Sequence, residues 1–119
     1  MAKTFKDLFA WQKAFELAAE VYRLTQKFPD QERFGLTAQL RRSVVSIASN
    51  IAEGQARDLP ADFARLLSMA MGHVQEFETQ LLLAIRLGFL PEEAAKPHLE
   101  LATEVGKLVR GLRKSVVQQ

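Results

Sequence analysis

Residues 36 to 56 follow a helical pattern of apolar and polar positions, but the predicted helix has almost no charged face. At about 100° per residue, the larger apolar side chains fall on one narrow stripe, made by Leu36, Leu40, Val44, Ile47 and Ile51. A second, smaller apolar side lies opposite, formed by Ala38, Val45, Ala48 and Ala52. An ordinary surface helix keeps a charged face toward water. The pattern therefore predicts a helix that other protein groups enclose on most sides.

Between these two apolar sides runs a ladder of polar residues, formed by Gln39, Arg42, Ser46, Asn50 and Glu53. Buried donors and acceptors without a partner cost about 1–3 kcal/mol each, so an enclosed ladder must bond to other protein groups. Farther along the chain, Glu78 falls among apolar positions and also needs a partner. We expect Arg42 to be buried and to pair with Glu78 or Glu53, within the chain or across subunits. The ladder and Glu78 then form a structural polar network.

Helical periodicity recurs along the rest of the chain, and we find no strand-period pattern. The predicted helices cover residues 7–27, 36–54, 60–87 and 91–116. Pro29 and Gly88 indicate helix ends, and Pro60 suits a first helical position. Pro97 lies inside the fourth helix, where we expect a break or a kink. Short connections between long helices predict an all-α, antiparallel up-down-up-down four-helix bundle, with residues 1–119 as a single domain.

The first two helices carry more apolar surface than the core of one such bundle needs. Trp11, Phe15, Ala18 and Tyr22 form the central stripe of the first helix, and further apolar positions widen it. Apolar surface beyond the needs of a core is typical of an interface between copies. We therefore expect a homo-oligomer that assembles through the first and second helices.

Composition sets limits on function. The 119 residues include no cysteine, which excludes disulfides, thiolate metal sites and thiol nucleophiles. The N-terminus lacks a signal-peptide pattern, and no apolar run approaches the ~20 residues of a membrane span. We expect a soluble, cytoplasmic protein with no membrane contact and no cofactor. The formal net charge of +2 is too small to indicate nucleic-acid binding by itself.

Two groups of residues suggest chemistry. His73, Glu76 and Gln80 share one face of the third helix, but a di-iron bundle needs Glu-x-x-His on two helices. His73 and His98 are better explained as core-edge or interface residues, so we expect neither a metal site nor catalytic residues. The fourth helix ends with a cationic run, which suits a helix C-terminus and which a ring would repeat around its rim, giving a candidate nucleic-acid surface. Its members are Lys107, Arg110, Arg113 and Lys114.

The chain resembles the four-helix-bundle proteins encoded in intervening sequences of bacterial 23S ribosomal RNA genes. The family's central pattern, Gln-x-x-Arg-x-x-x-Ser-x-x-x-Asn-Ile-x-Glu-Gly, is met by Gln39, Arg42, Ser46, Asn50, Ile51, Glu53 and Gly54, and Arg57 fits the arginine that follows. The third-helix pattern is met by Phe63, Leu67, Ala70, Gly72, Glu76, Glu78, Gln80, Leu81, Gly88 and Leu90, and the first-helix pattern by Trp11, Tyr22 and Pro29. Departures occur at His73, Leu59 and Gln55-Ala56, and they concern loop geometry more than fold.

This resemblance implies a homopentamer around a central channel. It also implies kinship with the accessory variability protein of diversity-generating retroelements, which partners a reverse transcriptase and binds nucleic acid. The first class of function is thus a non-enzymatic, ring-like homo-oligomeric assembly module, with a role as an RNA or nucleoprotein accessory. The alternative is an enzyme or small-ligand binder that uses a pocket between subunits, lined by the ladder. Expected partners are further copies of the chain, structured RNA or DNA, or another protein.

Overall fold

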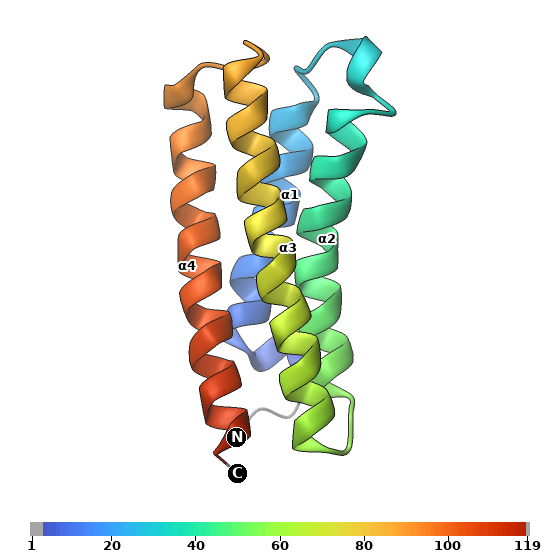
Figure 1. The fold of residues 1–119 in the computed structure, drawn as a ribbon, viewed down its shortest axis with the longest axis vertical. Coiled ribbons are helices and arrows are strands. Elements are labelled where there is room, and N and C mark those ends of the chain that lie inside the picture. The colour runs from blue at the N-terminus through green and yellow to red at the C-terminus, as the bar shows by residue number, and fades with distance from the viewer. Residues whose placement is uncertain (1–3, 119) are drawn as a thin grey trace.

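The computed structural model describes residues 4–118, which form four long helices packed side by side (Figure 1). They are α1 (Phe9–Thr25), α2 (Leu36–Gln55), α3 (Pro60–Arg86) and α4 (Glu92–Val117). Two short 3-10 turns, η1 (Phe5–Asp7) and η2 (Asp30–Glu32), precede α1 and α2. The described part of the chain contains no strand, so the predicted all-α, four-helix class is confirmed.

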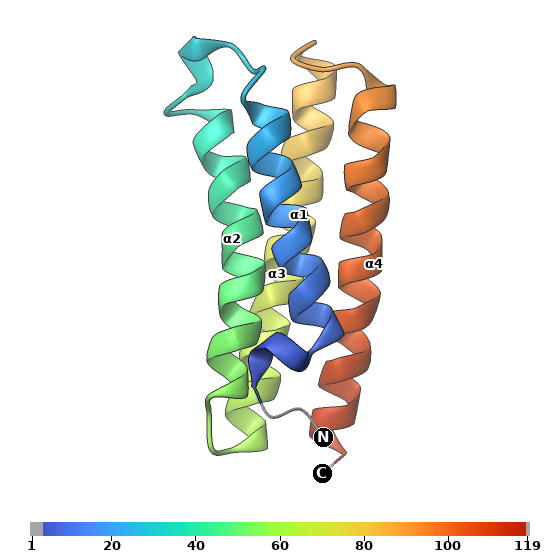
Figure 2. The same cartoon turned by 180° about the vertical axis from the view of Figure 1, so that it is seen from behind.

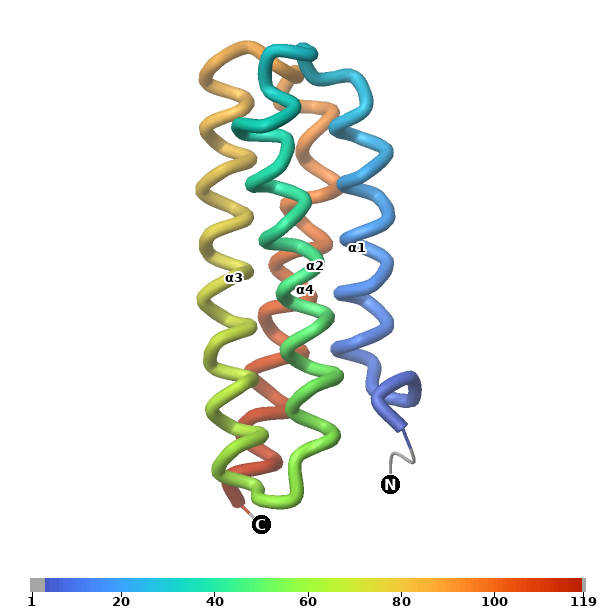
Figure 3. Tube along the Cα trace, turned by 90° about the vertical axis from the view of Figure 1, so that its right-hand side faces the viewer, coloured from blue at the N-terminus to red at the C-terminus, as the bar shows by residue number. Residues whose placement is uncertain are grey.

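The connections alternate between the two ends of the molecule. Figures 1 and 2 show the α1–α2 and α3–α4 connections at one end and the short α2–α3 loop at the other. Around the bundle, α1 packs against α2 and α4, and α3 packs against the same two helices. The described residues form a rod of 46 × 24 × 20 Å (Figure 3). The bundle therefore presents four long faces, each formed by two neighbouring helices.

The apolar stripe predicted for the second helix lies at the centre of the core. Leu40, Val44, Ile47 and Ile51 have no solvent exposure. They belong to one core cluster with large side chains of α3 that are at most 1% exposed, namely Leu67, Val74, Phe77 and Leu81. Truncating a residue of this kind to alanine typically costs about 2–5 kcal/mol. The buried side of α2 is thus the side that the helical periodicity of the sequence predicts. Within residues 4–118, no helix has the length and apolar character that a membrane crossing requires.

Helix ends agree with the predicted bounds to within two residues. The largest differences are in α1, which begins at Phe9 because Thr4 and Asp7 form a capping box around η1. At the other end of the bundle, Gly88 adopts φ +80°, and the N–H of Phe89 donates to the carbonyl of Ala84 at 3.0 Å. This left-handed residue and this bond are those of a Schellman ending. Glycine at this position therefore closes α3 as expected.

Pro97 does not break α4, so of the two outcomes expected at this position the break is wrong and the kink stays a prediction. The helix is continuous from Glu92 to Val117. Proline removes the hydrogen bond that the carbonyl of Glu93 would otherwise accept. Glu93 is exposed in the first turn, so water can satisfy that carbonyl. The missing hydrogen bond lies near the start of the helix and on its solvent-exposed side, where its loss is tolerated.

Gly54 permits the close approach of α2 to α3, and we predict that Gly54→Ala destabilises the bundle. A Cβ at this position would lie 2.6 Å from Cδ1 of Phe63 and 3.4 Å from Cβ of Leu66. Overpacking of this kind typically costs about 1–3 kcal/mol. The free energy of unfolding in urea measures the effect.

The matched control is Gly72→Ala in α3, where an added Cβ would meet nothing within 4 Å. This substitution should raise the free energy of unfolding by about 0.5–1 kcal/mol, because alanine favours a helix over glycine. Equal effects of the two substitutions would show that the Gly54 contact does not limit packing.

Candidate functional site

The polar ladder of α2 lies along an open edge of the bundle. In the described chain Gln39, Arg42 and Glu53 are exposed, and Ser46 and Asn50 are half-buried. Other helices therefore enclose the apolar stripe of α2, as predicted, but they do not enclose its polar ladder. The ladder is available to a partner outside the chain.

The expected ion pair of Arg42 within the chain is wrong. Arg42 is exposed, and no carboxylate among residues 4–118 lies within ion-pair distance of it. Glu53 instead pairs with Arg57, one turn farther along, at 3.0 Å. Glu78 is half-buried on α3 and makes no ion pair within the described chain. A pair across subunits, the other alternative, stays a prediction.

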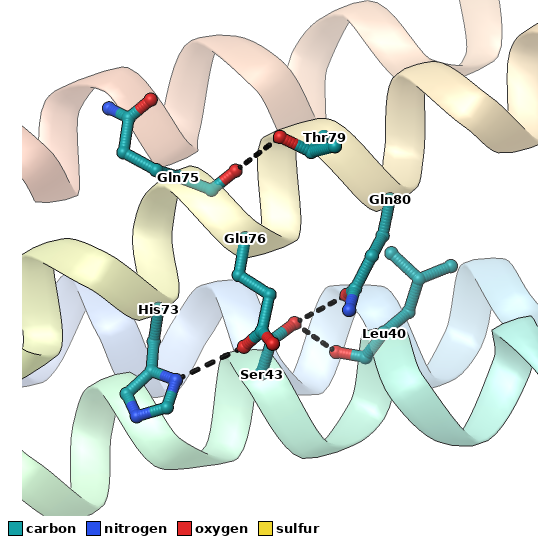
Figure 4. Close-up of polar contacts among 7 residues, drawn as sticks. All are labelled: Leu40, Ser43, His73, Gln75, Glu76, Thr79 and Gln80. Carbon is teal, nitrogen blue, oxygen red and sulfur yellow. Dashed lines mark hydrogen bonds and ion pairs between the residues drawn. The ribbon is translucent and has the colours of Figure 1, made fainter.

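The buried polar link between α2 and α3 is made by a residue outside the predicted network. Ser43 is 1% exposed, and its hydroxyl lies 3.0 Å from both Oε1 of Gln80 and the carbonyl oxygen of Leu40 (Figure 4). The single hydroxyl proton is shared between these two acceptors. Ser43 falls beside Leu40 and Val44 on the buried stripe, and this position in the helical pattern was the signal that could have identified it. The link joins the two helices beside their shared apolar core.

His73 and Glu76 extend this polar seam toward solvent. Nδ1 of His73 lies 3.1 Å from Oε1 of Glu76, three residues farther along α3 (Figure 4). His98, on α4, contacts the carbonyl oxygen of Ala94 through Nδ1 at 3.2 Å. Within the described residues no group of three histidine, aspartate or glutamate side chains is placed to hold a metal ion. Both histidine side chains are half-buried and make these local contacts.

An apolar groove runs between α1 and α2. It has a volume of about 250 Å³ and is lined by Trp11, Phe15, Ala18, Val45, Ala48, Ser49 and Ala52, which together we call the α1–α2 face. The rings of Trp11 and Phe15 stack with centroids 4.8 Å apart. Phe15 is 58% exposed and Val45 41% exposed. Large aromatic groups on α1 and small residues on α2 therefore form an open apolar surface.

Arg41 connects α2 to the last turn of α1, one helical turn before the groove residue Val45. Its guanidinium lies 4.5 Å from the centroid of the Tyr22 ring, and its Nε donates to Oγ1 of Thr25 at 2.9 Å. The hydroxyl of Thr25 in turn donates to the carbonyl of Val21 at 2.8 Å. These bonds tie α2 to the last turn of α1, so the groove is a fixed feature of the bundle.

The cations of the fourth helix lie near its C-terminal end, and all four are exposed. Arg113 reaches across to α3, where its Nε donates to Oγ of Ser68 at 2.7 Å. With Arg110 and Lys114 it borders a second groove, of about 410 Å³, between α3 and α4. Lys107 is not among the residues that line this groove. The structure thus brings three of the four predicted cations together, and nucleic-acid binding by them stays a prediction.

The comparisons with known proteins agree with this architecture. The family model described as 23S rRNA-intervening sequence protein matches residues 6–111. The chain belongs to the 23S rRNA-intervening sequence protein family. The match contains α1, α2, α3 and most of α4, and it ends before Arg113 and Lys114.

Among solved structures, this member of the 23S rRNA-intervening sequence protein family is similar to a protein of unknown function from the S23 ribosomal protein family of Bacteroides thetaiotaomicron. The two are 29% identical, the alignment covers 88% of this chain and 98% of that one, and the TM-score is 0.82. No curated protein matches the chain. These findings confirm the resemblance and the fold. The matched family and the similar structure name no catalytic activity.

Ser43 and Arg42 are neighbours in sequence but differ in burial, and we predict opposite outcomes for their removal. Ser43→Ala leaves Oε1 of Gln80 without its partner at the helix seam and should lower the free energy of unfolding by about 1–2 kcal/mol. Arg42→Ala removes an exposed side chain and should change the same quantity by less than about 0.5 kcal/mol.

Urea unfolding at a low protein concentration measures both effects with little contribution from association. A larger loss for Arg42→Ala than for Ser43→Ala would contradict this assignment. It would show that Arg42 has a buried partner.

Proposed function

We propose that this protein is a non-enzymatic assembly module that forms a closed homo-oligomer by burying its α1–α2 face against a second copy. The observation that carries the proposal is the open groove between α1 and α2, with exposed Phe15 and Val45 at its sides. Contiguous apolar surface of this kind is unfavourable in water and is typical of an interface. The same face contains the aromatic and the small residues that a tightly packed contact needs.

The chemistry of the α1–α2 face favours assembly over catalysis. Of its seven lining residues, Ser49 has the only aliphatic hydroxyl, and none is a carboxylate or a histidine. A hydroxyl nucleophile needs an adjacent base within hydrogen-bond reach, and the lining offers no such base. The alternative, a ligand pocket lined by the ladder, needs the ladder residues of two copies and so also depends on assembly.

The polar ladder supports the same proposal. Uncharged serine and asparagine side chains can enter an interface at a lower desolvation cost than charged ones, provided that they find partners. Ser46 and Asn50 are half-buried in the single chain and lie on the same helix as the groove residues Val45 and Ser49. A neighbouring copy that covers the groove would therefore also reach part of the ladder. The family resemblance implies that the oligomer has five copies and forms a ring.

We predict that Ser49→Arg prevents assembly without unfolding the bundle. Ser49 is exposed in the single chain, so arginine fits there when the groove is open. In an assembled interface its charge would lose water without gaining a partner. A penalty of about 3 kcal/mol or more raises the concentration needed for assembly by roughly 100-fold or more. Sedimentation velocity gives the mass, and circular dichroism checks the helical content.

Thr103→Arg is the matched control, because it places the same charge at an exposed position on α4, away from the groove. The wild type and this control should sediment as one oligomer, with the mass of a pentamer, and Ser49→Arg as a monomer. A monomeric wild type at micromolar concentration would overturn the proposal. A stable dimer would be consistent with the proposed interface but would contradict the ring.

A further inference from the structure

The groove between α3 and α4 combines positive charge with an apolar floor. Its volume is about 410 Å³, and it is lined by Ser68, Met71, Arg110, Arg113, Lys114 and Val117. We call these residues the α3–α4 groove. None of them belongs to the α1–α2 face, so this surface is independent of the interface proposed for assembly.

One wall of the groove is a row of cations on α4. Arg110, Arg113 and Lys114 are spaced by three and four positions, so they share one side of the helix. Arg113 is held by its Nε bond to Oγ of Ser68 at 2.7 Å. This bond leaves the two terminal nitrogens of its guanidinium free to bind a carboxylate or a phosphate in the two-pronged geometry that arginine favours.

The described side chains near this row of cations do not neutralise its positive charge. No carboxylate lines the groove. The nearest preceding acid on α4, Glu104, lies toward α1, where its Oε1 is 3.7 Å from Nζ of Lys13. On α3, Arg65 lies about one turn before Ser68, and its guanidinium contacts the sulfur of Met69 at 3.6 Å. The local field is therefore positive and selects an anionic ligand.

The floor distinguishes between classes of anionic ligand. It contains Met71 and Val117, and Val117 is 52% exposed. A nucleic-acid backbone uses the cations but gains nothing from apolar side chains, and single-stranded bases stack on aromatic rings. The residues that line the groove include no aromatic ring. A ligand that carries carboxylates beside apolar side chains satisfies both parts of the groove.

We propose that the α3–α4 groove binds an acidic amphipathic segment of another protein. Carboxylates of the segment pair with Arg110, Arg113 and Lys114, and an apolar side chain packs against Met71 and Val117. Arg113, Lys114 and Val117 lie beyond the part of the chain that the family model matches. The proposal goes beyond self-assembly: it gives the assembled module a cargo-binding surface on each copy.

The probe for this surface is a short synthetic helical peptide, fluorescein-labelled, with leucine on one side and glutamate on both flanks. Its binding to the full-length protein is measured by fluorescence anisotropy at low and moderate salt. A peptide of the same composition with scrambled order and a labelled RNA hairpin serve as comparison ligands. We expect the amphipathic peptide to bind, and the scrambled peptide and the RNA to bind at least about tenfold more weakly.

Two variants separate the charge from the floor. Arg110→Glu with Lys114→Glu should weaken peptide binding by about tenfold or more. Lys27→Glu with Lys96→Glu changes the net charge equally at exposed positions outside the groove and should have little effect. Val117→Ser should weaken peptide binding by roughly fivefold and leave RNA binding unchanged, because only the peptide uses the floor. Circular dichroism and sedimentation verify that each variant keeps its fold and its mass.

Three results would overturn the proposal. RNA binding that is tighter than peptide binding and unaffected by Val117→Ser would make the groove a phosphate surface. Equal binding of the ordered and the scrambled peptide would reduce it to non-specific attraction. Absence of binding at low salt would leave the cations with only their role at a helix C-terminus.

Discussion

In the described chain α2 packs against α3 more extensively than any other two helices pack together, and this seam decides which side of α2 is buried. Leu40, Val44 and Ile47 are excluded from water, and Gly54 lets the two helices approach closely. The shared proton of Ser43, between Leu40 and Gln80, also joins the two helices at this seam. Once this side of α2 is committed to the core, its opposite side must face outward. That outward side is short of charge, and part of it forms the α2 side of the α1–α2 face.

A bundle of four helices keeps surfaces of different chemistry apart, because each long face is formed by a different pair of helices. The α1–α2 face is apolar, the edge between α2 and α3 is polar, and the α3–α4 groove is cationic with an apolar floor. The proposed self-assembly and the proposed peptide binding therefore use separate faces of one scaffold. This separation allows each proposal to be tested with variants that leave the other surface unchanged.

Much of the fold could be predicted from the sequence, because helical periodicity and the signals at Pro29, Pro60 and Gly88 are local. They fix where a side chain points around its own helix, and the buried stripe of α2 followed directly. They do not fix which neighbouring helix stands beside it. For this reason Arg42 was expected to be buried and paired with Glu78 or Glu53, whereas in the described chain it is exposed and makes no ion pair. Ser43, in turn, was not recognised as the link to Gln80. The surplus apolar surface on the first two helices was predicted, but the groove required the two helices side by side.

Trp11 can report directly on whether another copy covers the α1–α2 face. It is the single tryptophan of the chain, and it is half-buried in the groove. Acrylamide quenching of its fluorescence measures its exposure to solvent, with the Ser49→Arg protein as the open reference. If another copy covers the face, quenching in the wild type at micromolar concentration should be severalfold weaker than in the Ser49→Arg protein. Equal quenching of the two proteins would mean that the face is open, and would rule out assembly through it.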